Sequence, residues 1–137
     1  MDAIQRIPAI LIVDDDELVR TLLFRLVTAF FENKQMGFTC QQAGDSDVAL
    51  SILEENQFDL IFMDVQMPGH MDGVGLIQVV RANEKGNGRI PSKIICITGN
   101  HTQEEGERAM RAGANRCMFK PFAIQNVFAL LAEKFGG

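Results

Sequence analysis

The sequence predicts an α/β protein in which a doubly wound sheet of five parallel strands carries helices on both faces. Five short apolar runs alternate with longer segments whose apolar residues recur at helical spacing, and the connections between them are short. A parallel strand is covered on both faces, so it forms an unbroken apolar run rather than an alternating one. The 137 residues fit one domain, residues 1–137 with a core at about 8–134, and we expect no output domain.

The N-terminal part of the chain contains two strand and helix pairs. Residues 10–13 form an apolar run that predicts a buried strand, and three aspartates follow it. The core-facing stripe of the first helix consists of Val19, Leu22, Leu23, Leu26, Val27 and Phe30. Residues 38–43, which alternate less regularly, are assigned to a second strand. Asp45 or Ser46 caps the second helix. The buried side of this helix consists of Val48, Ala49, Ile52 and Leu53.

The central strand is predicted at residues 60–63, an apolar run too short for a helix, which ends at Asp64. Ligands collect outside the carboxyl ends of parallel strands, so a carboxylate at this end is a candidate site residue. The alternative is that Asp64 begins a turn. A third helix begins near Gly73, and a flexible loop follows at residues 83–88. The inward-facing residues of this helix are Val74, Ile77 and Val80.

Two strands and two helices complete the chain. Residues 94–97 predict a fourth strand that ends at a threonine, and residues 102–105 form a capping box that opens a fourth helix. We expect this helix to be mobile, because Gly106 interrupts it and its apolar content is low, and it closes at Gly113. Residues 117–119 form the fifth strand. The apolar stripe of the last helix consists of Ile124, Val127, Phe128 and Leu131.

Composition excludes several classes of function. The formal net charge of −5 and the pI near 5.0 argue against direct binding of nucleic acid. No apolar run approaches the length of a membrane span and no signal peptide is present, so we expect a cytoplasmic protein without membrane contact. Cys40, Cys96 and Cys117 lack metal-ligand spacing, and we expect buried free thiols rather than a disulfide or a metal site.

Polar residues follow the carboxyl ends of four predicted strands, and these ends meet at one edge of a parallel sheet. Asp14 and Asp15 follow the first strand, Asp64 the third, Thr98 the fourth and Lys120 the fifth. Three carboxylates at one edge would repel each other unless a cation lies among them. Oxygen ligands without histidine or cysteine indicate a hard cation, Mg²⁺ or Mn²⁺. The alternative is that the aspartates only cap the first helix, which is the interpretation that we favour for Asp16.

Five short motifs occur in this order along the chain: Asp14-Asp15, Asp64 followed by Met67-Pro68 and Met71-Asp72-Gly73, Ile97-Thr98-Gly99, and Lys120-Pro121-Phe122. In these motifs the chain resembles the receiver domains of two-component response regulators, which have a flavodoxin-like fold, a three-layer sandwich of five strands and five helices. The motifs extend over essentially the whole chain. The resemblance implies a signalling switch rather than an enzyme, one that catalyses only its own phosphorylation and dephosphorylation. It also implies a histidine kinase or phosphotransfer protein and a downstream effector as partners, and a monomer or a weak phosphorylation-dependent dimer.

By this resemblance Asp64 is the phosphoacceptor. A carboxylate is a legitimate nucleophile toward phosphorus when the charge on the phosphoryl oxygens is neutralised. The implied Mg²⁺ ligands are Asp15, Asp64, Asp14 through water and the backbone carbonyl of Gln66. Lys120 pairs with Asp64 before the reaction and with the phosphoryl group afterwards. A cis peptide bond between Lys120 and Pro121 is also implied, and it would direct the lysine side chain toward Asp64.

The resemblance also implies a switch in which the Thr98 hydroxyl moves toward the phosphoryl group. The backbone N–H of Gly99 supplies a second donor, and the glycine, where alanine is commoner, leaves the approach to the acceptor open. The vacated space lets a side chain of the fifth strand rotate inward. This residue is usually aromatic, but the matching position is Cys117, which has no ring to bury.

A second departure from the receiver-domain pattern is the loop at residues 67–73, which is one residue longer than usual. This loop contains the first of two histidines in the chain. His70 and His101 are interpreted as solvated rather than as ligands. Gln66 and Asn100 occupy the two variable positions linked in this family to the lifetime of the acyl phosphate.

Two other classes of function compete with the phosphoacceptor switch. The first is a haloacid-dehalogenase-type phosphohydrolase that uses Asp14 as its nucleophile, since Asp14-x-Asp16 follows a buried strand. Against it, Leu18 replaces the usual small β-branched residue and no acidic pair follows Lys120. The second is a pseudo-receiver that binds partners without being phosphorylated.

Overall fold

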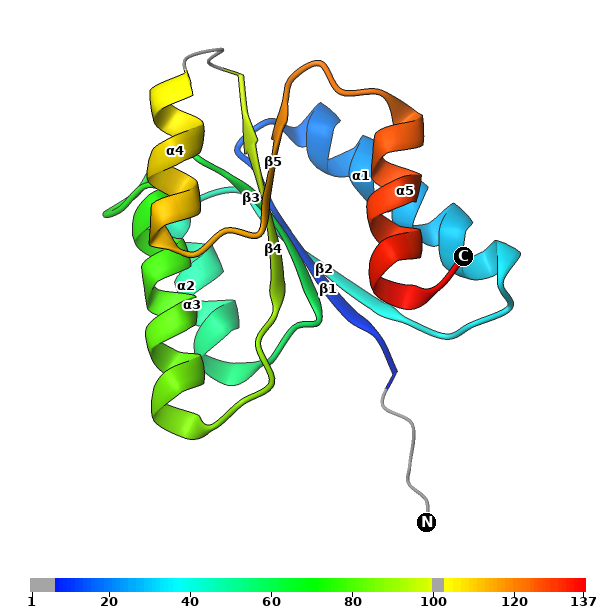
Figure 1. Cartoon of the computed structure of the whole chain (residues 1–137), viewed down its shortest axis with the longest axis horizontal. Coiled ribbons are helices and arrows are strands. Elements are labelled where there is room, and N and C mark those ends of the chain that lie inside the picture. Colours follow the sequence, from blue (N-terminus) through cyan, green and yellow to red (C-terminus); the bar gives the residue numbers. More distant parts are fainter. Residues whose placement is uncertain (1–6, 100–102) are drawn as a thin grey trace.

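The computed structural model describes residues 7–99 and 103–137, so the predicted capping residue Thr102, together with Asn100 and His101, lies outside the described residues. One parallel sheet with the strand order β2-β1-β3-β4-β5 forms the centre (Figure 1). The strands are β1 (Ala9–Val13), β2 (Thr39–Ala43), β3 (Leu60–Asp64), β4 (Lys93–Thr98) and β5 (Arg116–Phe119). The predicted strands and their parallel arrangement are confirmed.

Five helices cover the two faces of the sheet. They are α1 (Glu17–Asn33), α2 (Ser46–Glu55), α3 (Gly73–Asn87), α4 (Gln103–Ala112) and α5 (Ile124–Phe135). Helices α1 and α5 lie on one face, and α2, α3 and α4 lie on the other (Figure 1). This is the predicted three-layer, doubly wound arrangement. Within the described part of the chain, none of the helices combines the length and apolar character needed to cross a membrane.

The sheet separates two apolar cores. Alternate residues of each strand point to opposite faces, so Leu11 and Met63 enter the core beneath α2 and α3, whereas Ile12 and Phe62 enter the core beneath α1 and α5. All five residues of β3 are buried, as expected for the strand in the middle of the sheet. Burial on both faces therefore explains why these strands are unbroken apolar runs.

Aspartates cap three helices. Asp16 accepts a hydrogen bond from the backbone N–H of Leu18 (2.9 Å), which supports its interpretation as a cap of α1. Asp45 caps α2 in the same way, and Asp72 caps α3 through the N–H of Gly75 (3.0 Å). Each carboxylate pairs one of the N–H groups that a helix leaves without a partner at its start.

The predicted flexible loop at residues 83–88 is wrong, because α3 continues to Asn87 and ends at Gly88 with a left-handed φ of 61°. The reason is an inward-facing Glu84. Its carboxylate accepts hydrogen bonds from the backbone N–H and the hydroxyl of Ser92 (both 2.7 Å) and from Arg81 (2.7 Å). A polar residue therefore anchors this end of the helix, which the apolar pattern did not indicate.

Most of the predicted core-facing residues of the helices are buried, but some at the edges of the apolar stripes are not. Leu22, Val48 and Ile124 were expected in the core but are 39%, 45% and 48% exposed. In contrast, Phe31 is fully buried, whereas Phe30 at its side is only half-buried. Because residues at the edge of a stripe face either core or solvent according to how the helix is rotated on the sheet, packing decides their exposure.

Candidate functional site

The carboxyl ends of β1, β3, β4 and β5 bring the predicted polar residues to one edge of the sheet. Asp14 follows β1, Asp64 ends β3, Thr98 ends β4 and Lys120 follows β5. From the neighbouring strands β1 and β3, the chain continues to α1 on one face and to α3 on the other. A crevice forms where neighbouring strands lead to opposite faces, and ligands of open parallel sheets bind in that position.

Three carboxylates form an acidic cluster in this crevice. Asp14, Asp15 and Asp64 each offer one carboxylate oxygen, and these oxygens all lie within 4.8 Å of one another. Asp14 is fully buried and Asp64 is 3% exposed, whereas Asp15 is exposed. Backbone N–H groups hold one oxygen of each buried carboxylate: Asp16 donates to Asp14 Oδ1 (2.9 Å) and Gln66 to Asp64 Oδ1 (3.1 Å). The predicted convergence of these aspartates is therefore present.

Lys120 lies across the other oxygens of the two buried carboxylates. Its Nζ is 2.9 Å from Asp14 Oδ2 and 3.5 Å from Asp64 Oδ2, so its nearer partner is Asp14 rather than the expected Asp64. Partial burial of the ammonium opposes its charge, but the two carboxylates outweigh that effect and raise the pKa of Lys120. The peptide bond between Lys120 and Pro121 is cis, as predicted.

Burial is the main influence on the Asp64 carboxyl group. It raises the pKa of Asp64 from 3.8 to about 7, and the charge of Asp14 adds to the increase. Lys120 and the Gln66 N–H act in the opposite direction but do not cancel it. In the protein alone, the buried surroundings of Asp64 therefore favour its protonated form, and a cation in the cluster would favour its ionised form.

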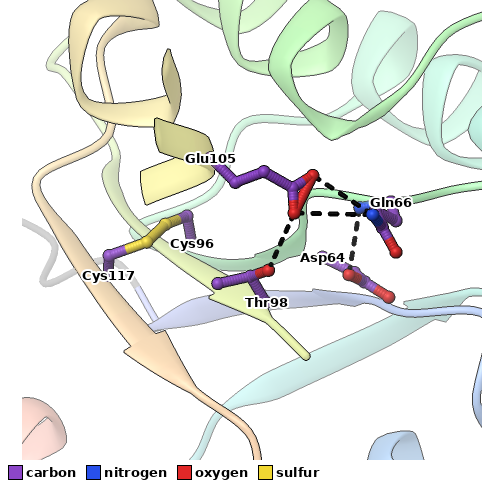
Figure 2. The surroundings of a disulfide bond; sticks show 6 residues. All are labelled: Asp64, Gln66, Cys96, Thr98, Glu105 and Cys117. Atoms are coloured by element: carbon purple, nitrogen blue, oxygen red, sulfur yellow. Dashed lines mark hydrogen bonds between the residues drawn. A yellow bond between two sulfur atoms is a disulfide. The ribbon is translucent and has the colours of Figure 1, made fainter. Parts of the chain in front are cut away.

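Thr98 lies at the end of β4 near the acidic cluster, and its hydroxyl points toward α4. It donates a hydrogen bond to Oε2 of Glu105 (3.3 Å), and the side-chain amide of Gln66 donates to the same carboxylate (3.2 Å to Oε1), as Figure 2 shows. The sequence pattern places Glu105 only in a helix cap. No spacing in the sequence marks this contact, because it depends on how α4 packs against the sheet.

Gly99 was expected to leave the approach to Asp64 open. Among the described residues, the atom that a Cβ at this position would meet is Cδ of Lys120, at 3.9 Å. Because this is an ordinary van der Waals distance, an alanine would also fit. The glycine therefore widens the approach by no more than a methyl group.

The expectation of free thiols is wrong for two of the three cysteines. Cys96 of β4 and Cys117 of β5 form a disulfide bond (Figure 2). The sheet register places the two residues directly opposite each other, with Cα atoms 4.5 Å apart and side chains on one face, which the sequence spacing of 21 did not reveal. Cys117 therefore does not carry the freely rotating side chain expected at the switch position. Cys40 is a free thiol as predicted, and burial raises its pKa to about 12.

Two glycines shape the loop that follows β3. Gly69 has a φ of 117°, and a Cβ atom there would lie 2.0 Å from the hydroxyl of Ser46. A Cβ atom at Gly73 would lie 1.9 Å from the backbone oxygen of Asp64. The loop thus packs closely against both α2 and the end of β3. The exposed His70 at its tip pairs with Asp47 of α2 (2.8 Å), whose hydrogen bond raises the pKa of the histidine.

The fold and the site together define a class of protein. A lysine, a hydroxyl and buried carboxylates at the crevice of a five-stranded parallel sheet are the arrangement of a flavodoxin-like phosphoacceptor switch. The family of response regulator receiver domains matches residues 10–132. The chain belongs to this family, and it is a signalling module of the two-component type.

Individual relatives support this assignment. The chain is 34% identical to a probable chemotaxis protein CheY of Rhizobium etli over 128 residues, which cover 93% of this chain and 92% of that protein. It is 33% identical to the sensor histidine kinase RcsC of Escherichia coli, of which it covers only 12%. The crystal structure of a CheY-like receiver domain protein from Methanospirillum hungatei superposes with a TM-score of 0.77 at 26% identity, covering 94% of both chains. Relatives thus include both a small regulator and a segment of a large kinase.

Proposed function

We propose that Asp64 accepts a phosphoryl group from a phosphohistidine of a histidine kinase or phosphotransfer protein. The observation that carries the proposal is the surroundings of Asp64: a buried carboxylate at the end of the central strand, within reach of the Lys120 ammonium and beside Asp14 and Asp15. A sensor histidine kinase among the relatives supports this class of donor. We also propose that the chain is one receiver domain with its core at residues 8–134.

In the proposed reaction, a carboxylate oxygen of Asp64 forms a bond to phosphorus while the bond from phosphorus to the imidazole nitrogen breaks. The imidazole leaves with the electron pair of that bond and takes up a proton. Only the ionised carboxylate attacks, so Asp64 must first release the proton that burial favours. Lys120, 3.5 Å from Asp64 before the reaction, would then neutralise part of the charge on the phosphoryl oxygens. Thr98 and the Gly99 N–H would donate hydrogen bonds to these oxygens.

The residues of the acidic cluster fit a hard divalent cation, Mg²⁺ or Mn²⁺. The cluster offers only oxygen donors, and the three oxygens lie within 4.8 Å of one another, with the Lys120 ammonium 2.9 Å from Asp14 Oδ2. We assign Asp14, Asp15, Asp64 and the backbone carbonyl of Gln66 as the residues that would hold the ion. When bound, the ion would neutralise charge on the phosphoryl oxygens and favour the ionised form of Asp64. Asp16 is occupied as a helix cap and is not included.

Labelling with radioactive acetyl phosphate and Mg²⁺ tests the proposal. We expect label on the wild-type chain in an acid-stable, alkali-labile bond, and no label on Asp64→Asn. Asp47→Asn serves as the matched control, because Asp47 is an aspartate that lies outside the acidic cluster and pairs with His70. Its labelling should equal that of the wild type.

Two outcomes would overturn the proposal. Label that persists in Asp64→Asn and maps to Asp14 would indicate the phosphohydrolase alternative. An NMR spectrum unchanged by Mg²⁺ and beryllofluoride, a phosphoryl analogue, in a chain that also takes up no label would indicate a pseudo-receiver. NMR is the suitable probe because the chain contains no tryptophan or tyrosine.

A further inference from the structure

The position that matches the rotating aromatic residue of receiver domains cannot act in the expected way here. Cys117 is tied to Cys96 on the neighbouring strand β4, so its side chain does not rotate while the disulfide is intact (Figure 2). A signal from Asp64 to the surface formed by α4 and β5 must therefore use another contact. The structure supplies one at the N-terminal end of α4.

Glu105 is the contact between α4 and the phosphoacceptor site. Its half-buried carboxylate accepts hydrogen bonds from Thr98 at the end of β4 (3.3 Å) and from Gln66 just after β3 (3.2 and 3.4 Å). Both donors lie near Asp64, because Gln66 follows it by two residues and Thr98 comes directly after its strand partner Ile97 (Figure 2). The distances are long for such bonds, so a competing acceptor can replace them at modest cost.

We infer that Glu105 is a positioning residue that holds α4 against the site in the unphosphorylated chain and is displaced when Asp64 carries a phosphoryl group. The inference rests on the proposed function of Asp64. A threonine hydroxyl has one proton and donates it to one acceptor at a time, so Thr98 bonds either Glu105 or the phosphoryl group. The two negative groups also repel each other across the crevice. Both effects favour separation of Glu105 from the site after phosphorylation.

Helix α4 is held lightly enough to respond. The buried residues among its ten are Gly106 and Ala109, so the helix adds little to the apolar core. Its ion pair between Arg108 and Asp72, the residue that caps α3, is long (3.5 Å) and exposed, and such pairs contribute little to stability. The helix is continuous through Gly106, which was expected to interrupt it. Loss of the Glu105 contacts can therefore shift α4 as a unit.

A shift of α4 would change a surface that is already incompletely filled. A shallow groove of about 370 Å³ lies between α4 and β5, with Met110 and Phe119 on its walls. At its base, a Cβ atom on Gly106 would lie 3.7 Å from the sulfur of Cys117, so the helix rests directly on the disulfide. The covalent pair provides a fixed surface over which α4 moves. Phosphorylation would thereby be reported by the helix rather than by a strand side chain.

Titration with beryllofluoride in the presence of Mg²⁺, followed by NMR, tests this inference. For Glu105→Gln, which removes the charge and keeps the shape, we expect about tenfold tighter beryllofluoride binding, at the lower end of the effect of a hydrogen bond to a charged group. We also expect α4 amide signals of the free variant to move toward their positions in the beryllofluoride-bound wild type. Loss of a merely structural contact would not tighten binding. Glu104→Gln, a neighbouring exposed residue, should match the wild type.

The outcomes separate this inference from the proposed function. If beryllofluoride does not bind the wild type, the proposed function of Asp64 fails. If it binds the wild type and Glu105→Gln equally, with unchanged α4 signals, only the Glu105 inference is overturned. Repeating the titration with dithiothreitol tests whether the signal instead passes through the side chain of Cys117. If the α4 signals respond only after the disulfide is reduced, the coupling belongs to Cys117 and the inference is also overturned.

Discussion

Raising the pH should destabilise the metal-free chain because of Asp64. Burial raises the pKa of this carboxyl group to about 7 from 3.8, so the folded chain keeps a proton that the unfolded chain releases. The unfolded state therefore binds fewer protons between these two values, and the free energy of unfolding falls as the pH rises through this window. Below pH 3.8 the stabilising effect of the retained proton is complete, and above about pH 7 it is lost.

The size of the effect follows from the two pKa values. At 1.36 kcal/mol for each factor of ten in proton affinity, the full difference corresponds to about 4 kcal/mol. About 2–3 kcal/mol of it falls between pH 5 and pH 8. Asp64 is 3% exposed, so solvent screening reduces this value little. The Glu84 carboxyl group has a lowered pKa, and its favourable contribution is complete above its ordinary value of 4.5, outside the window.

Urea unfolding followed by far-ultraviolet circular dichroism, with EDTA and without reductant, measures the effect at pH 5 and pH 8. The comparison is with Asp64→Asn, which cannot ionise. The raised pKa of the exposed His70 gives a change of the same sign, but both proteins contain it, so it cancels in the difference. The difference in unfolding free energy between the two proteins should change by about 2–3 kcal/mol across this range, and Mg²⁺ should reduce the change. Identical pH dependence of the two proteins would refute the reasoning.

Two further predictions concern the disulfide and the loop after β3. Reduction of Cys96–Cys117, which closes a loop of 21 residues, should lower the free energy of unfolding by about 3 kcal/mol; urea midpoints with and without dithiothreitol measure this, and equal midpoints would contradict it. Gly73→Ala places a Cβ atom 1.9 Å from the Asp64 backbone oxygen, so it should cost about 1–3 kcal/mol and abolish the NMR response to beryllofluoride. Gly86→Ala, in open space on the same helix, should be neutral or stabilising by up to about 1 kcal/mol, and similar losses in the two variants would argue against close packing at Gly73.

Most of the fold was predictable because the signals are local. The apolar runs at residues 10–13, 60–63 and 94–97 are buried strands, since a strand covered on both faces has no solvent side to mark with polar residues. Short connections between alternating strands and helices then leave a parallel sheet as the arrangement. The weaker signals, such as the edges of the helical stripes, depended on helix rotation and were partly wrong.

The acidic cluster was predictable for the same reason. Asp14 follows a buried strand and Asp64 ends one, and parallel strands end at a common edge, so their sequence positions imply their proximity. The nearer contact of Lys120 with Asp14 was not implied, because a long side chain can reach several partners and the packing of the site selects among them. Glu84 was missed for a related reason: a buried glutamate interrupts the apolar pattern that marks a helix face.

By itself, the sequence determined the order and type of the elements and the set of polar residues at one edge of the sheet. The reason is that apolar runs mark the buried strands, and the alternation of strands with helices makes the strands parallel. Only the tertiary structure decided that Cys96 faces Cys117 and that Glu105 reaches Thr98. Both contacts join segments whose distance depends on sheet register and on the placement of α4. These are properties of packing between elements, and the spacing of residues along one element does not encode them.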